Sequence, residues 1–428
     1  MGVFIYRSAS SQGRGTLSTA GVKLQWAITF SNVDPQSHNI KLEVFALEMV
    51  RIPAGAFSVG DGTATTVTGQ FSTAGATTPF NIASENAITL GPGGLGNRSH
   101  SGMATADDFT DAAAPSAAPV NLPAAFPKGY QAFYIMKYDL TQGQYRDFLN
   151  TLTRTQQNQR AGNGTTLASG TTSVTNRYVM PNTNIAANIA SGSNYRNGIR
   201  CDATIHATNP IIFYCDFNGN GIPNEPTDGE FIACNYLSWP DLIAYADWAG
   251  LRPMTELEYE KACRGTANPI AGEYAFGSAT ATASASGPTN SGANNETATN
   301  GGNCLYSGGV AGPVRSGFAA TSSSSRYSAG ASFYGVMELS GNLWKRPVTV
   351  GNATGRLFTG LHGNGALDAN GNADVSLWPG TGATGSGFRG GNWGNVATYA
   401  RVSDRYYAAN TDAFRSYTLG VRLARTSP

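Results

Sequence analysis

Phe388-Arg-Gly-Gly-Asn-Trp393 opens the stretch of sequence that decides the fold, and the segments Ala400-Arg-Val-Ser-Asp-Arg405 and Leu419-Gly-Val-Arg-Leu423 complete it. Of the chain's 28 basic residues, only six are lysine. Arginine holds fixed, bidentate hydrogen bonds better than lysine does. We therefore expect the glycines and arginines of this stretch to form a rigid frame, made of Gly390, Gly391, Arg401, Arg405, Gly420 and Arg422.

The composition argues against nucleic acid and membrane partners. The 428 residues carry a net charge of +1, and only 13% of them are charged, about half the ordinary share. Such a chain has no strong field to attract nucleic acid or acidic lipid, and no apolar run reaches the ~18 residues that span a bilayer. A weakly charged chain rich in Gly, Ser, Thr and Asn is typical of extracellular and assembled proteins, so we expect an extracellular location or a cell or particle surface.

The sequence between residues 133 and 265 predicts one strand, Phe133–Leu140, and three helices. Each helix begins at a residue whose side chain can cap it: Thr141, with Gln144 completing a capping box; Ser238; and Thr255, with Glu258 completing a second box. Four apolar residues follow the first cap at helical spacing, and we expect them to face the core: Tyr145, Phe148, Leu149 and Leu152.

Five segments resemble, in the same order, the formylglycine-generating enzyme family: residues 49–60, 133–152, 235–265, 335–344 and 388–423. The most specific of them, besides the C-terminal stretch, contain Leu251-Arg-Pro-Met-Thr-Glu256 and Gly335-Val-Met-Glu-Leu-Ser-Gly-Asn-Leu-Trp344. The resemblance implies an irregular, C-type-lectin-like α+β fold with two main helices, short twisted antiparallel sheets and long ordered loops.

The resemblance also sets the expected domain boundaries. Residues 49–428 would form the family domain, with insertions at 61–127, 155–232 and 266–330. Residues 1–48 alternate apolar and polar side chains, which predicts an N-terminal β segment that is either Ig-like or an extension of the main sheet.

The catalytic centre of the family has no counterpart in this sequence. In catalytic members a cysteine pair that binds copper follows the Gly-Gly turn, whereas here Gly394-Asn-Val-Ala-Thr-Tyr399 follows it and no cysteine lies beyond Cys304. Thiolates supply soft metal ligands and nucleophiles, which these residues cannot replace. We therefore expect no copper and no formylglycine-generating activity.

The five cysteines match no zinc spacing. Cys201 and Cys215 flank a loop, so both a disulfide between them and two free thiols remain open. Cys263 falls within a predicted helix, and we expect it to be a small buried apolar residue.

Two places suggest calcium. The family carries a structural calcium whose first acidic position corresponds to Glu338, but Lys345 replaces its last acidic ligand, so we expect a Glu338–Lys345 ion pair in place of the ion. Independently, Asp216-Phe-Asn-Gly-Asn-Gly-Ile-Pro-Asn-Glu225 resembles an EF-hand-type loop. Its expected ligands are Asp216, Asn218, Asn220, Ile222, Asn224 and Asp228; the alternative is a polar loop of Asx turns.

The C-terminal stretch interleaves the frame with residues suited to binding. These display residues are Trp393, Asn395, Tyr399, Tyr406, Tyr407, Asn410, Asp412, Phe414 and Tyr417. Their position resembles that of the changeable residues in variable proteins diversified by retroelements. The alternative is that these aromatics pack the core or a subunit contact.

We therefore expect a non-catalytic binding or structural protein at a surface, whose partner is a protein, a glycan or copies of itself. Two alternatives remain open: a carbohydrate-binding module, and an enzyme with a different active site on the same fold.

Overall fold

The structure is a computed structural model that describes residues 43–62, 67–110, 120–162, 167–168, 170–174, 177–180 and 194–427. Most of the predicted N-terminal β segment, residues 1–48, lies outside these described residues. Its described part, residues 43–48, contains no strand.

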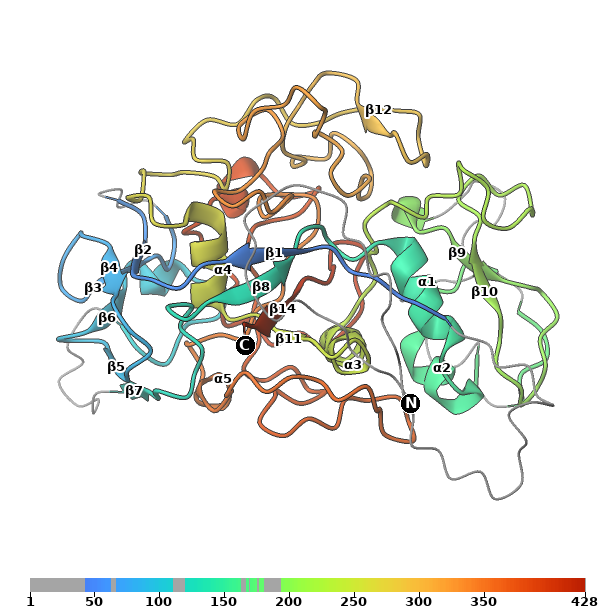
Figure 1. Cartoon of the computed structure of the whole chain (residues 1–428), viewed down its shortest axis with the longest axis horizontal. Helices are drawn as coiled ribbons and strands as arrows, with labels where there is room; N and C mark the ends of the chain where they lie inside the picture. Colours follow the sequence, from blue (N-terminus) through green and yellow to red (C-terminus); the bar gives the residue numbers. More distant parts are fainter. Residues whose placement is uncertain are drawn as a thin grey trace, which may run out of the picture.

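A four-stranded antiparallel sheet lies at the centre of the molecule (Figure 1). Its order is β1 (Met49–Ile52), β8 (Phe133–Met136), β14 (Leu423–Thr426) and β11 (Arg252–Pro253). Ile52 pairs with Phe133, and Ala424 pairs with Ile135. The sheet therefore joins segments from the beginning, middle and end of the described chain. The predicted strand at 133–140 is confirmed but ends at Met136.

Five helices accompany the sheet within the described residues: α1 (Gln142–Asn150), α2 (Arg154–Arg160), α3 (Trp239–Trp248), α4 (Glu256–Arg264) and α5 (Ala353–Arg356). In Figure 1, α4 lies on one side of the central strands while α1 and α2 lie on the other. The predicted caps are confirmed: Thr141, Ser238 and Thr255 each accept a hydrogen bond from the backbone three residues later. The longest of these helices has ten residues, and no described helix is long and apolar enough to cross a membrane.

The predicted apolar face of α1 is confirmed, because Tyr145, Phe148 and Leu149 are fully buried. The Phe148 ring packs edge-on against Tyr245 and Trp248 of α3, with ring centroids 5.4 and 5.3 Å apart. The main core therefore lies where α1 meets α3. A second core joins α4 to the central sheet and includes Cys263, which is buried as predicted.

The first insertion contains small sheets as well as loops. One sheet pairs β2 (Phe57–Val59) with β4 (Phe80–Ile82). A four-stranded sheet has the order β3 (Phe71–Thr73), β6 (Leu95–Asn97), β5 (Ile88–Leu90) and β7 (Val120–Leu122). Each of these strands has only three residues, so the weak pattern of residues 61–127 did not reveal the five that lie within that range.

Two short hairpins lie in the other insertions: β9 (Ile199–Cys201) with β10 (Phe213–Cys215), and β12 (Pro288–Thr289) with β13 (Thr297–Ala298). Three 3-10 turns complete the elements: η1 (His100–Gly102), η2 (Asn194–Arg196) and η3 (Ala397–Ala400). Cys201 pairs in register with Phe213, not with Cys215, and all five cysteines are free thiols. A Cys201–Cys215 disulfide is therefore not formed. Short strands, few helices and long loops confirm the predicted irregular α+β architecture.

Candidate functional site

A buried ionic network fixes the C-terminal stretch to α4. The guanidinium of Arg405 contacts both carboxylate oxygens of Glu256 at 2.8 and 2.9 Å, and Arg389 contacts Glu256 at 3.0 Å and Glu260 at 2.5 Å. Asp107 joins from the first insertion, 2.7 Å from Arg405. All of these side chains are fully buried. The frame arginine Arg405 is thus held as predicted, and Arg389 is a further anchor that the sequence analysis missed.

A second buried cluster surrounds Lys345. Its ammonium donates to the Gly341 carbonyl at 2.5 Å and lies 3.9 Å from a carboxylate oxygen of Asp139. Glu338 instead accepts from the backbone N–H of Gly317 at 2.7 Å. The expected Glu338–Lys345 ion pair is therefore wrong, because Asp139 is the carboxylate that lies beside the ammonium.

The segment that follows the Gly-Gly turn, residues 394–399, leads into η3 and contains no thiol. All five cysteines lie elsewhere and are buried. Burial raises the pKa of Cys263 and of Cys304 to about 12. Since the thiolate is the reactive and metal-binding form, these two thiols are poorly suited to nucleophilic or redox chemistry.

Three tyrosines form a surface above the frame. Tyr399, Tyr406 and Tyr407 are partly exposed, and each ring contacts both of the others at centroid distances of 4.6 to 5.9 Å. The buried Trp344 supports Tyr399 and Tyr407 from below, at 6.2 and 5.6 Å. We call Tyr399, Tyr406 and Tyr407 the tyrosine surface. The structure thus brings together three predicted display residues that are up to eight positions apart.

Trp393 belongs to the interior and not to the display surface. Only 7% of it is exposed, its indole N–H donates to the Tyr417 carbonyl at 3.1 Å, and its ring contacts Tyr195 and Tyr417. The sequence analysis placed Trp393 among display residues because η2, which supplies Tyr195, is almost two hundred positions away. The alternative reading, packing, is the better description of this one residue.

The remaining display residues lie at or near the surface. Phe414 and Asp412 are exposed, Tyr417 is 38% exposed, and Asn395 and Asn410 are partly exposed. Asn410 accepts the Asp412 backbone N–H at 2.9 Å. Asn395 accepts from the buried Asn392, so its amide is partly committed to the turn.

The predicted calcium ligands lie together in the loop that follows β10, with one exception. Asp216 and Asp228 are fully buried, whereas Asn218, Asn220 and Ile222 are exposed. The Asn224 amide oxygen instead turns toward the protein, where it accepts from the Cys215 backbone at 3.2 Å and from Arg146 at 2.7 Å.

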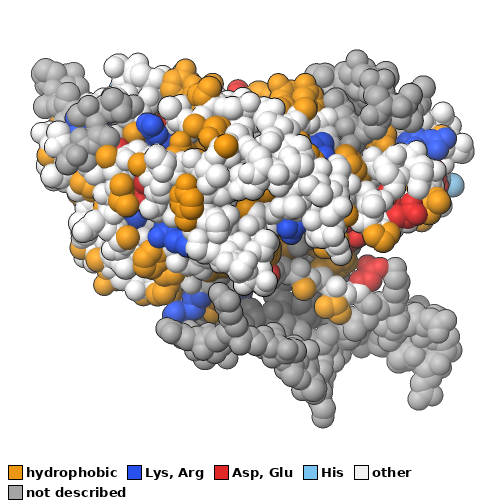
Figure 2. Space-filling view, turned by 90° about the horizontal axis from the view of Figure 1, so that it is seen from above, with side chains coloured by type: hydrophobic (Ala, Val, Ile, Leu, Met, Phe, Trp, Pro, Cys, Tyr) orange, Lys and Arg blue, Asp and Glu red, His pale blue; other side chains and the backbone are white. Residues whose placement is uncertain are grey.

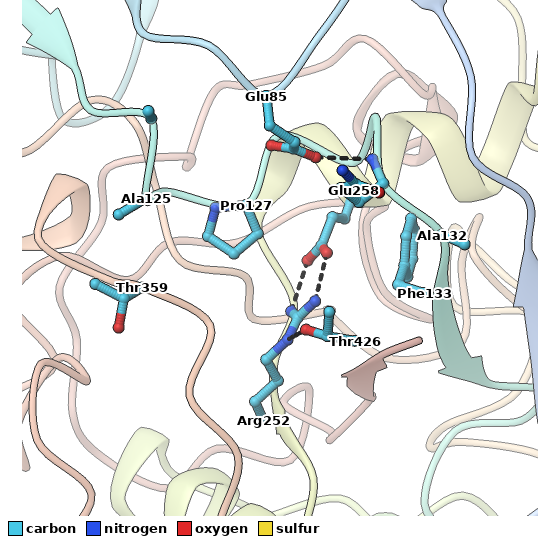
Figure 3. Close-up of a pocket in the computed structure, with 11 residues that line it drawn as sticks. Glu85, Ala125, Pro127, Ala132, Phe133, Arg252, Glu258, Thr359 and Thr426 are labelled. Atoms are coloured by element: carbon cyan, nitrogen blue, oxygen red, sulfur yellow. Dashed lines mark hydrogen bonds and ion pairs between the residues drawn. The ribbon is translucent and has the colours of Figure 1, made fainter. Parts of the chain in front are cut away.

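A pocket of about 170 Å³ lies at the end of the central sheet, where β11 and β14 meet the start of α4 (Figure 3). Arg252 and Glu258 point toward each other there and form two hydrogen bonds of 2.8 and 2.6 Å, while Thr426 accepts from the same guanidinium at 3.0 Å. Glu85 accepts the backbone N–H of Lys128 and of Gln131 at 2.7 and 2.9 Å.

The charged groups of this pocket therefore already have partners within the protein. Glu258 also accepts the Thr255 backbone N–H and so completes the cap of α4. The sequence analysis missed the pocket, but its polar groups serve to join the sheet to the helix.

Comparison with known proteins bears on the C-terminal half. Residues 234–427 match the model of the sulfatase-modifying factor enzyme 1-like domain. No curated protein matches the chain.

Three solved structures are similar to most of the chain. PvdO from Pseudomonas aeruginosa is 17% identical, with 88% of this chain and 94% of that chain covered and a TM-score of 0.36. CarF is 14% identical, with 89% and 98% covered and a TM-score of 0.33. Treponema denticola variable protein 1 is 12% identical, with 88% and 94% covered and a TM-score of 0.31.

The region matched by the family model contains α3, α4, the two arginines that contact Glu256, and the tyrosine surface. This part of the chain, residues 234–427, is therefore similar to the sulfatase-modifying factor enzyme 1-like domain family.

Proposed function

We propose that the chain is a non-catalytic binding protein, acting outside the cell or on a surface, that holds a protein partner against its tyrosine surface. The observation that carries this proposal is a contrast within one segment. Arg389 and Arg405 are completely buried in ion pairs, whereas eight of the nine predicted display residues are partly or largely exposed. A rigid support that carries exposed aromatic and amide side chains favours recognition.

The chemistry of the tyrosine surface suits a protein partner. Tyrosine offers a large apolar ring and a hydroxyl at low entropic cost, because it has only two side-chain torsions. The contacts among Tyr399, Tyr406, Tyr407 and Trp344 already restrict the rings. Little rotamer freedom would therefore be lost when a partner binds.

Self-association is a second candidate, and one observation favours it. Figure 2 looks down on the loops around β12, and this face has few charged side chains among many uncharged ones. Charged residues are depleted at the centres of protein interfaces. A second copy of the chain would thus meet little charge that must be desolvated.

The test is site-specific photo-crosslinking in native material, with a photoreactive phenylalanine analogue at position 406. The control carries the same analogue at Ile212, which is 77% exposed and precedes β10. We expect a covalent adduct with a distinct protein from position 406 and none from position 212. A covalent adduct between two copies of the chain would support self-association. The absence of any adduct from position 406 would contradict binding through this surface. Oxygen consumption with a cysteine peptide would contradict the non-catalytic role.

A further inference from the structure

The loop between β10 and the start of the family domain has an unusual charge distribution. Residues 216–228 contain three carboxylates, on Asp216, Glu225 and Asp228, and no lysine or arginine. Two of these carboxylates are completely buried: Asp216 and Asp228 have no exposed surface. Two buried anions in one short loop require compensation from another group.

The protein provides that compensation to only one oxygen of each carboxylate. Asp216 Oδ2 accepts from the Gly221 backbone at 3.1 Å and from the Arg200 guanidinium, and Asp228 Oδ2 accepts from the Glu225 backbone at 2.6 Å. The Oδ1 atom of each residue is buried and has no hydrogen-bond partner among the described residues. A buried, unpartnered carboxylate oxygen is costly, so the folded loop has unused capacity for a cation at two points.

The two buried carboxylates differ in their cationic partners. Arg200 is the cation that contacts Asp216, and Asp228 has no ion pair among the residues the structure describes.

Neutral oxygen donors lie on the same turn. Asn218 and Asn220 each accept the backbone N–H two residues later, at 2.9 and 2.8 Å, which fixes the direction of both amide oxygens. The Ile222 carbonyl accepts no backbone hydrogen bond from the part of the chain that the structure describes. Gly221 has φ of +84°, a conformation that lets the loop reverse sharply between these donors.

We propose that this loop binds one calcium ion through the Asp216 and Asp228 carboxylates, the Asn218 and Asn220 amides and the Ile222 carbonyl. Calcium takes six to eight oxygen ligands in flexible geometry, and water would complete the set. Magnesium demands near-ideal octahedral geometry and releases its water reluctantly, so it is the poorer fit. The site lies outside residues 234–427 and is independent of the binding function proposed above.

Binding there would strengthen the junction between two insertions. The Phe217 backbone N–H donates to the Asp228 carbonyl at 3.2 Å, and Gly229 donates to Gly292 of the third insertion at 2.9 Å. Arg200 also connects the loop to β9. The ion would therefore stabilise the hairpin β9–β10 against the remainder of the fold.

The test measures calcium binding by isothermal titration calorimetry on the whole chain after treatment with a chelator, and thermal unfolding with and without calcium. We expect one ion per chain, with a dissociation constant in the micromolar to millimolar range. At a calcium concentration about 100 times that constant, the unfolding midpoint should rise by ~3 °C. Asp228→Asn should weaken calcium binding at least ~10-fold. The control is Asp202→Asn, since this exposed carboxylate lies just beyond β9 and should leave binding unchanged.

The chelated state adds a second comparison. There Asp228→Asn should be at least as thermostable as the wild type, because the amide keeps an acceptor for Glu225 and removes an uncompensated buried charge. In the presence of calcium, the wild type should be more thermostable than Asp228→Asn. Asn218→Ala, at an exposed position, offers a variant that leaves the buried groups intact and should also weaken binding. The proposal is overturned if the wild type binds no calcium at about 1 mM, or if both loop variants bind it as the control does.

Discussion

Arg405 contacts Glu256 at two points across 149 positions of sequence, with its Nε and Nη2 atoms 2.8 and 2.9 Å from the two carboxylate oxygens. Burial alone would raise the pKa of Glu256, but Arg405 and then Arg389 outweigh that effect, so the pKa lies below its ordinary value. The first turn of α4 thus supplies the charge that fixes the C-terminal stretch.

Replacing this carboxylate tests how far the fold depends on the network. Glu256→Gln leaves Arg389 and Arg405 buried beside a neutral amide, and we expect the free energy of unfolding to fall by ~3–5 kcal/mol. Guanidinium unfolding followed by tryptophan fluorescence measures the change. The matched control is Glu48→Gln, which removes an exposed ion pair with Lys137 and should cost less than about 1 kcal/mol. Equal losses of unfolding free energy in the two variants would show that the buried network stabilises the fold no more than the exposed ion pair does.

The local parts of this architecture were predictable from sequence, and the distant contacts were not. The capping boxes at Thr141 and Thr255 depend on residues three positions apart, so their pattern is visible in the sequence. Arg405 was predictable as a frame residue, but its partner Asp107 lies 298 positions away within an insertion of weak pattern. Nothing local marks Asp107 as a core residue.

In the candidate site, too, local features were predictable from the sequence and distant contacts were not. The composition of the C-terminal stretch predicted nine display residues between Trp393 and Tyr417, and the structure groups the rings of three of them. The burial of Trp393 depends on the Tyr195 ring, 5.4 Å away, which another insertion provides. In the loop of residues 216–228, the sequence pattern suggested Asp216 and Asp228 as ligands, whereas the contact between Asn224 and Arg146 required the packing of α1.

Trp393 should therefore affect stability more than recognition. Trp393→Ala removes a buried indole and its hydrogen bond to Tyr417, and we expect a loss of ~3–5 kcal/mol in unfolding free energy. Tyr406→Ala, at a partly exposed position, should cost ~1 kcal/mol or less. Urea denaturation of the two variants measures both values. A Trp393→Ala protein as stable as Tyr406→Ala would mean that the indole is not part of the core.

Asp404 should make stability depend on pH. Burial raises its pKa from the ordinary 3.8 to about 7, which the hydrogen bond from Tyr406 and the nearby arginines only partly oppose. The folded state therefore binds a proton more tightly than the unfolded state, so stability from this group is present at low pH and is lost as pH rises from about 4 to about 7.

Asp404→Asn removes the titratable carboxyl group and its pH-dependent contribution to stability. The new amide oxygen can still accept the Tyr406 backbone N–H. Between about pH 5 and about pH 8, the wild type should lose ~2 kcal/mol more unfolding free energy than the variant does. Urea midpoints at the two pH values measure the difference. Parallel pH profiles for wild type and variant would contradict a raised pKa at Asp404.

The five thiols provide a direct test of the buried environment. All are free and buried, and burial raises the pKa of Cys201, Cys215, Cys263 and Cys304 to about 12 and that of Cys234 well above its ordinary value. Since disulfide exchange requires an accessible thiolate, the native chain should react with dithionitrobenzoate only as fast as it unfolds. After denaturation in guanidinium, all five thiols should react at once and release five equivalents of thionitrobenzoate per chain. Rapid labelling of one thiol in the native chain would instead show that a reactive cysteine is accessible at the surface. That result would support thiol chemistry in this protein.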